Sequence, residues 1–119
     1  MSTEERHRNW KMRIQDILDC ISKIQSYVAG MTLDEFRNDS LRIDAVIRNL
    51  EIIGEAAGHI PVEVQERYPD LAWLEMRGMR NIMVHEYFGV SIPIIWHTIQ
   101  NDLGPLEEGI RRILDEYFA

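Results

Sequence analysis

The sequence predicts an all-α protein, a compact four- to five-helix up-and-down bundle formed by one domain over residues 1–119. Apolar residues recur at steps of three and four through most of the chain, which is the period of one helix face. No segment alternates apolar and polar residues as a half-buried strand would, and no repeat of fixed length is present. A length of 119 residues suits a single hydrophobic core.

The first helix is predicted from an apolar stripe that starts at Trp10 and ends before Gly30, a residue suited to stopping a helix. Cys20 lies in this helix, and because it is the one cysteine of the chain we interpret it as a small buried thiol. Thr32 followed by Glu35 has the form of a capping box and predicts a short helical turn. The stripe consists of Trp10, Ile14, Ile17, Ile21, Ile24 and Val28.

The second long helix is predicted to begin at Asp39 or Ser40, either of which can cap it, and to end near Gly58 ahead of Pro61. Small residues close to its end, Gly54 among them, allow another helix to approach closely. Its core-facing stripe is formed by Ile43, Val46 or Ile47, Leu50, Ile53 and Ala57.

Two prolines bound a short helix or turn over residues 62–68, and Asp70 is placed to cap the third long helix. Ser91 is expected to cap a last helix that has Pro93 in its first turn. Gly104-Pro105 is predicted to kink or break that helix before its period resumes through residues 106–117. Its stripe is Ile92, Ile95, Trp96, Ile99 and Leu103, continued by Leu106, Ile110, Ile113 and Leu114.

The formal net charge of −7 argues against a protein that coats nucleic acid nonspecifically, because such binding needs many cations on phosphate. Any contact with RNA must therefore be local. Arg6, Arg8, Lys11 and Arg13 form either a basic patch or a solvated helix face. The polar N-terminus does not resemble a secretory signal, and no apolar run reaches the ~18 residues that span a bilayer, so we expect a cytoplasmic protein without a membrane segment.

Reactive side chains concentrate in the stretch Gly78-Met79-Arg80-Asn81-Ile82-Met83-Val84-His85-Glu86-Tyr87-Phe88-Gly89. At about 100° per residue, Arg80, Asn81, His85 and Tyr87 share the side of the helix opposite Met79, Ile82 and Met83. RNA cleavage without a metal needs a base for the 2′-hydroxyl proton, an acid for the leaving 5′-oxygen and positive charge at the phosphorus. Arginine and histidine supply these functions, and the Asn81 amide can orient the imidazole or a phosphate.

Other chemistries find no support in the sequence. No glycine-rich phosphate loop is present, no paired cysteines have zinc spacing, and the residue three before each of His59, His85 and His97 is apolar, not the Glu of a di-iron bundle. We therefore predict neither a metal nor a cofactor. His7, His59 and His97 are interpreted as surface or capping residues, and the three tryptophans as residues that fill core or interface space.

The segment 78–90, with Arg80, His85 and Tyr87 in an Arg-x4-His-x-Tyr pattern, closely resembles the signature of the HepT-like family within the HEPN superfamily. The segment 47–57 resembles that family's second-helix signature, and residues 96–106 resemble its last helix. The resemblance extends from about Trp10 to Leu114, and it departs from the family at Ser91, where Asp is common, and at Gly104, where a second proline is frequent.

This resemblance implies a HEPN-like homodimer whose motifs face each other across a shared groove, and a metal-independent ribonuclease toxin. Arg80 and His85 correspond to the catalytic pair and Asn81 to a supporting residue. The implied partners are RNA and a cognate minimal nucleotidyltransferase antitoxin, which transfers AMP to the motif tyrosine, here Tyr87. A phosphate on Tyr87 beside Arg80 would block the groove. The alternatives are a non-catalytic nucleotide-binding or regulatory subunit of that transferase, and a dimerisation protein with a degenerate site.

Overall fold

The computed structural model describes residues 2–85 and 91–118, and of this part it leaves the side chains of His7 and residues 80–85 undescribed. Every regular element in the described part is helical, which confirms the all-α prediction. The helices are α1 (Thr3–Val28), α2 (Leu33–Arg37), α3 (Ser40–Ala57), α4 (Val62–Arg67), α5 (Trp73–His85), α6 (Ile92–His97), a π-helix (Thr98–Asp102) and α7 (Leu103–Tyr117).

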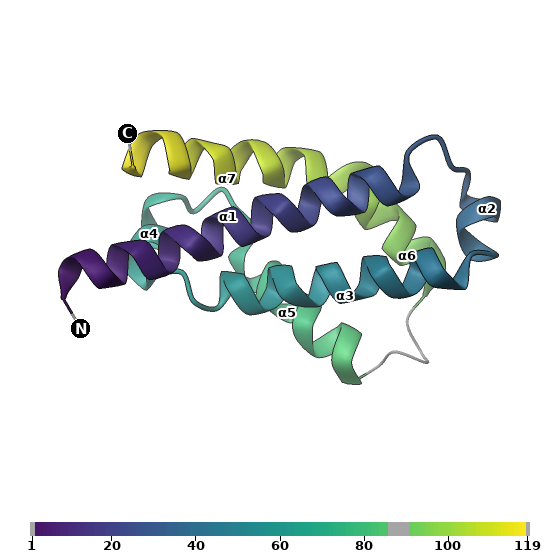
Figure 1. Ribbon diagram of the computed structural model, residues 1–119, viewed down its shortest axis with the longest axis horizontal. Helices are drawn as coiled ribbons and strands as arrows, with labels where there is room; N and C mark the ends of the chain where they lie inside the picture. The colour runs from purple at the N-terminus through teal and green to yellow at the C-terminus, as the bar shows by residue number, and fades with distance from the viewer. Residues whose placement is uncertain (1, 86–90, 119) are drawn as a thin grey trace.

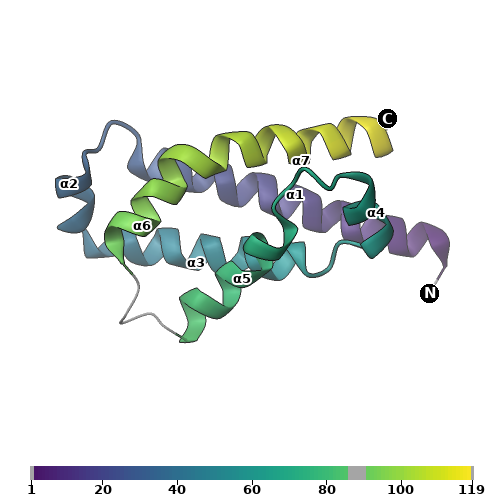
Figure 2. The same ribbon diagram turned by 180° about the vertical axis from the view of Figure 1, so that it is seen from behind.

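The long helices alternate in direction, as expected for an up-and-down bundle (Figure 1). Helix α1 lies between α7 and α3, and α5 packs on α3, while the short helices α2 and α4 lie at opposite ends (Figures 1 and 2). A helix of 26 residues is about 39 Å long, so α1 accounts for most of the 47 Å length of the molecule.

Helix α1 contributes the largest part of the core. All six residues of its predicted stripe are buried, and so is Cys20, whose pKa is raised because burial disfavours the thiolate. The helix begins earlier than its stripe, because Ser2 and Glu5 form a reciprocal capping box in which Ser2 Oγ accepts from the Glu5 amide at 3.1 Å. Gly30 follows the helix with a φ of 74°, a left-handed conformation that favours glycine.

The predicted caps of α2 and α3 are confirmed. Thr32 and Glu35 form a capping box, with the Thr32 amide donating to Glu35 Oε1 at 2.9 Å. Asp39, one of the two residues considered, caps α3 by accepting from the Arg42 amide at 3.1 Å. This bond is the main reason that the pKa of Asp39 is lowered. In α3, both Val46 and Ile47 are buried, so the apolar face is wider than a single stripe.

The prediction that Asp70 caps the third long helix is wrong. Helix α5 begins three residues later, at Trp73, and the Asp70 carboxylate instead accepts a hydrogen bond from Arg112 Nη2 of α7 at 2.7 Å. Ser91 occupies the N-cap position of α6, as predicted, but its side chain makes no capping hydrogen bond.

The predicted break at Gly104-Pro105 is located differently in the structure. Both residues lie inside α7, and the irregularity is the π-helix over residues 98–102 that precedes them. Proline has no backbone N–H and its ring clashes with the carbonyl one turn back, so widening the preceding turn accommodates Pro105 without ending the helix. The chain changes direction between α6 and α7 at this point (Figure 2).

Among residues 2–85 and 91–118, none of the helices combines the length and the hydropathy that crossing a bilayer requires.

Candidate active site

The motif predicted from the sequence lies at the end of α5. The backbones of Arg80, Asn81 and His85 belong to the last two turns of this helix, which ends at His85. Their side chains are among those that the structure leaves undescribed, and Tyr87 lies outside the described residues. The catalytic roles of Arg80 and His85, the supporting role of Asn81 and the modification of Tyr87 therefore stay predictions.

The first half of α5 is fixed by its apolar face. Trp73 is 7% exposed and Met76 is 1% exposed, and the half-buried Met79 packs against the same core. These residues recur at steps of three, which places them along one side of the helix. Because this side is buried against the bundle, the rotation of α5 about its own axis is set before the motif begins.

Hydrogen bonds anchor the chain just before α5. The indole Nε1 of Trp73 donates to the Tyr68 carbonyl at 2.9 Å, and the Tyr68 hydroxyl donates to Glu116 Oε2 at 2.8 Å. Burial and the neighbouring Glu116 carboxylate raise the pKa of Tyr68. The Arg112 guanidinium, which donates to Asp70, lowers the pKa of that carboxyl. The start of α5 is therefore fastened to α7.

The other end of α5 extends away from the bundle. In both views the last turn of α5 lies outside the outline of the remaining helices (Figures 1 and 2). The helix is therefore anchored at its start, and its backbone projects at its end.

A groove of about 410 Å³, which we call the α5–α7 groove, lies beside the first half of α5. Its floor is apolar, with Met76, Met79 and Leu106, but its lining includes Asp70, Glu75 and Asp102. Asp70 is paired with Arg112, but the carboxylates of Glu75 and Asp102 repel phosphate, so an RNA strand is disfavoured on this side of α5. The remaining lining residues are Leu71, Ala72, Asn101 and Pro105.

The other candidate residues behave as predicted where they are described. His59 and His97 are exposed, with the His59 ring 3.3 Å from Glu55 Oε1, while the side chain of His7 is outside the description. Trp10 and Trp73 are buried, and Trp96 packs against Phe36 with ring centroids 5.3 Å apart. Among the side chains that the structure describes, no group of three or more His, Cys, Asp or Glu is arranged to hold a metal ion.

One buried polar residue was missed by the sequence reasoning. Asn49 of α3 is 7% exposed, and its amide nitrogen donates to the Ala45 carbonyl one turn earlier at 2.8 Å. The signal was present, since Asn49 falls three residues after Val46 and four before Ile53, within the apolar stripe. Buried side-chain amides are normally hydrogen-bonded, and the Asn49 NH2 group finds its acceptor within its own helix.

The family model described as "Ribonuclease HepT-like" matches residues 17–113 of the chain, from the middle of α1 to the end of α7. The chain belongs to the HepT-like ribonuclease family. The resemblance that the segments 47–57 and 78–90 predict is thereby confirmed. As a member of this family, the HepT-like chain is a ribonuclease.

Curated relatives agree with this assignment. A "Putative RNase" of Caldanaerobacter subterraneus subsp. tengcongensis is 40% identical over 89 residues, which cover 75% of this chain and 80% of the relative. The "Probable ribonuclease HepT" of Thermococcus cleftensis is 36% identical over 100 residues, covering 84% and 91% respectively. A "Gamma-glutamylcyclotransferase and putative RNase" of Methanocaldococcus jannaschii is 38% identical over 106 residues, and the HepT-like chain spans only 48% of its length. No solved structure gives a significant match.

Proposed function

We propose that this HepT-like chain is the toxin of a toxin–antitoxin pair, a metal-independent RNA endonuclease whose active site consists of Arg80 and His85 with Asn81 in support. The observation that carries the proposal is the family match, because it spans residues 17–113 and so includes all four motif positions. The anchored start of α5 supports it, since a fixed helix can hold these residues in a constant geometry.

The chemistry follows from the side chains. A histidine acting as base takes the proton from a ribose 2′-hydroxyl, whose oxygen forms a bond to the adjacent phosphorus. The bond from phosphorus to the 5′-oxygen breaks, and a protonated histidine returns a proton to that oxygen. Arg80 neutralises the charge that develops on the phosphate oxygens. The products are a 2′,3′-cyclic phosphate and a free 5′-hydroxyl.

The same chemistry favours a homodimer. A single His85 cannot be both the unprotonated base and the protonated acid of one cleavage step. A two-fold axis would bring two copies of the motif, and so two histidines, to one groove. We place the second copy against the projecting end of α5. Such an enzyme acts on cellular RNA, so its place of action is the cytoplasm.

Tyr87 is the proposed switch. A partner nucleotidyltransferase would join the phenol oxygen of Tyr87 to the α-phosphorus of ATP, with loss of the phenolic proton and release of pyrophosphate. The added phosphate lies two residues from His85 and would compete with RNA for Arg80. Modification at this position would therefore abolish cleavage.

The decisive test compares wild-type protein with His85→Ala on a labelled single-stranded RNA. Loss of general acid–base catalysis is expected to slow cleavage about 100- to 10,000-fold. Cleavage by the wild type should persist in excess EDTA and should fail on the same strand with 2′-O-methyl riboses. If His85→Ala cuts at the wild-type rate, the proposed active site is wrong. Tight binding to the transferase without any RNA cleavage would instead favour the regulatory subunit.

The modification is tested by intact mass after co-expression with a cognate nucleotidyltransferase. We expect additions of whole AMP units on the wild type and none on Tyr87→Phe. Modified wild-type protein should have lost cleavage, and Tyr87→Phe should retain it in the presence of the transferase. Equal AMP addition to both chains would remove Tyr87 from the proposal.

A further inference from the structure

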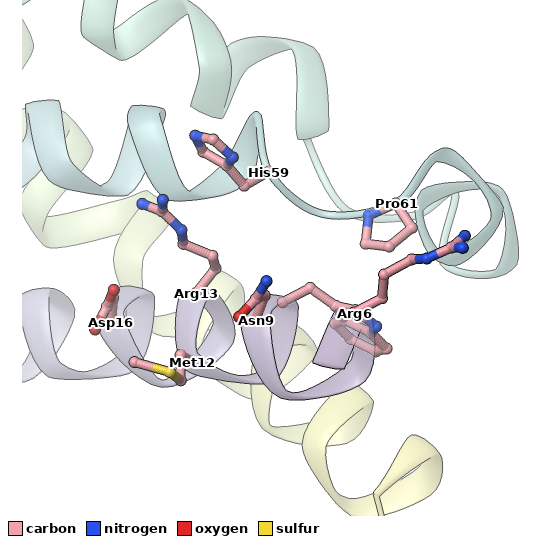
Figure 3. Close-up of a pocket in the computed structure, with 8 residues that line it drawn as sticks. Arg6, Asn9, Met12, Arg13, Asp16, His59 and Pro61 are labelled. Carbon is pink, nitrogen blue, oxygen red and sulfur yellow. The ribbon is translucent and has the colours of Figure 1, made fainter. Parts of the chain in front are cut away.

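A second groove lies between the first half of α1 and the turn that follows α3. We call it the α1 groove, and its volume is about 500 Å³. It is lined chiefly by Arg6, Asn9 and Arg13 of α1 and by His59 and Pro61 of the turn. Figure 3 shows Arg13 reaching from α1 toward His59, and Arg6 extending along Pro61.

The structure divides the four N-terminal cations that the sequence grouped together. Arg6 and Arg13 line the α1 groove, whereas Lys11 lies on another side of the helix, with its Nζ 5.3 Å from the centroid of the Phe118 ring. Arg8 does not line the α1 groove. Of the four cations, two therefore line one groove, with Arg13 near His59 at one end and Arg6 beside Pro61 at the other (Figure 3).

The charges of the α1 groove favour an anion. The lining contains two arginines, one histidine and a single carboxylate, Asp16. His59 also lies 3.3 Å from Glu55 Oε1 on the same side. No ion pair of Arg13 occurs within the described part of the chain, so its guanidinium keeps its donors for a ligand. The α5–α7 groove, with three carboxylates and no cation in its lining, has the opposite character.

This contrast bears on how an acidic protein holds RNA. With a net charge of −7, most of the surface repels a polyanion, and affinity depends on the few places where cations converge. The α1 groove is formed by α1 and the turn that follows α3, and α5 packs on the same helix α3 before it ends at His85.

We infer that the α1 groove binds the phosphate backbone of the RNA substrate at a distance from the cleavage motif, with Arg13 as its principal contact and His59 at its rim. The inference rests on the proposed RNA cleavage, because it supplies the substrate. Guanidinium groups hold two phosphate oxygens at once. Contacts to the sugar–phosphate backbone alone need no base-specific pocket.

The test measures binding apart from cleavage. Wild-type protein, Arg13→Gln and the matched control Arg111→Gln are titrated with a fluorescent 2′-O-methyl oligoribonucleotide that cannot be cut, at several salt concentrations. Arg111 of α7 lies outside the groove with 59% of its side chain exposed, so its substitution removes the same charge from another surface. Neither variant changes a residue of the proposed active site, and circular dichroism confirms that both are folded.

We expect Arg13→Gln to weaken binding about 3- to 10-fold near physiological salt and to reduce the slope of log affinity against log salt by about 0.7, the loss of one phosphate contact on a single strand. Arg13→Lys should recover part of the affinity, because it restores the charge without the planar fork. Arg111→Gln should bind like the wild type.

Three results would overturn the inference. If Arg13→Gln and Arg111→Gln bind RNA equally well while the wild type cleaves ordinary RNA, the groove is not part of the RNA path and the proposed function still stands. If Arg13→Gln weakens binding of polyglutamate and leaves RNA binding unchanged, the groove belongs to an acidic protein partner. A wild type that neither cleaves nor binds RNA would end the proposed function, and the inference with it.

Discussion

The close approach of α7 to the segment before α5 gives a sharp prediction at Gly109. Gly109 is buried in α7, and a Cβ built on it would lie 2.0 Å from Leu71 Cδ2, 3.1 Å from Cγ and 3.3 Å from Cδ1. Ordinary contact begins at 3.4 Å, so Cδ2 would have to move by at least 1.4 Å, the difference between 3.4 and 2.0 Å. Rotating Cδ2 alone does not suffice, because Cγ is also too close.

The substitution Gly109→Ala therefore has two opposing effects on stability. Alanine in a helix interior is worth about 0.5–1 kcal/mol over glycine, while forcing an extra carbon into a packed contact costs about 1–3 kcal/mol. The overpacking cost is the larger one here, since the whole Leu71 side chain has to shift. We expect a net loss of about 1–2 kcal/mol and, for a chain of this length, a fall in melting temperature of about 3–8 °C.

Urea unfolding followed by circular dichroism measures this change. Gly78→Ala is the matched control, because no atom lies within 4 Å of a Cβ at that α5 position, and we expect it to stabilise the fold by about 0.5–1 kcal/mol. Adding Leu71→Ala to Gly109→Ala should give a smaller loss than the sum of the two single changes. A neutral or stabilising Gly109→Ala would refute the steric reasoning.

Three further changes test other contacts. Ile14→Ala removes a fully buried α1 side chain and should cost about 2–5 kcal/mol in urea unfolding, so a loss below 1 kcal/mol would contradict its place in the core. Tyr68→Phe removes the hydroxyl that donates to Glu116 and should cost about 0.5–1.5 kcal/mol, and an unchanged midpoint would mean that this bond contributes nothing. The lowered pKa of Asp70 means that its pair with Arg112 stabilises the fold above the unfolded pKa of ~3.9, and that this contribution is lost as pH falls through the lower folded pKa. Asp70→Asn should therefore make the free energy of unfolding fall less steeply at acid pH. An unchanged dependence on pH would count against the pair.

Most of the fold could be predicted from periodicity and caps, because these signals are local. The six-residue stripe of α1 is buried as predicted, and the caps at Thr32 and Asp39 are those that the sequence indicated. The errors concern places where local rules compete. Pro105 was expected to kink or break a helix, yet a π-helix one turn earlier absorbs the missing N–H, and only the packing of both flanking segments decides between these outcomes.

The candidate site shows the same division. A helix carrying Arg80, Asn81 and His85 was predictable, because the apolar positions around them have helical spacing, and the structure confirms their backbone placement in α5. Their roles rest on the resemblance and on the proposed chemistry. The α1 groove was not predictable, since its two sides come from residues about 45 positions apart in sequence.

The sequence by itself determined which segments are helices, which side of each is apolar and where the reactive residues gather, because propensity, period and capping depend on neighbours within a few residues. The tertiary structure alone decided which surfaces meet. It paired Asp70 with Arg112, separated by 42 positions, placed Gly109 against Leu71, and divided Lys11 from Arg13, which share a helix but face different neighbours. Such choices depend on packing between helices, and a period along one helix does not encode the partner that its face will contact.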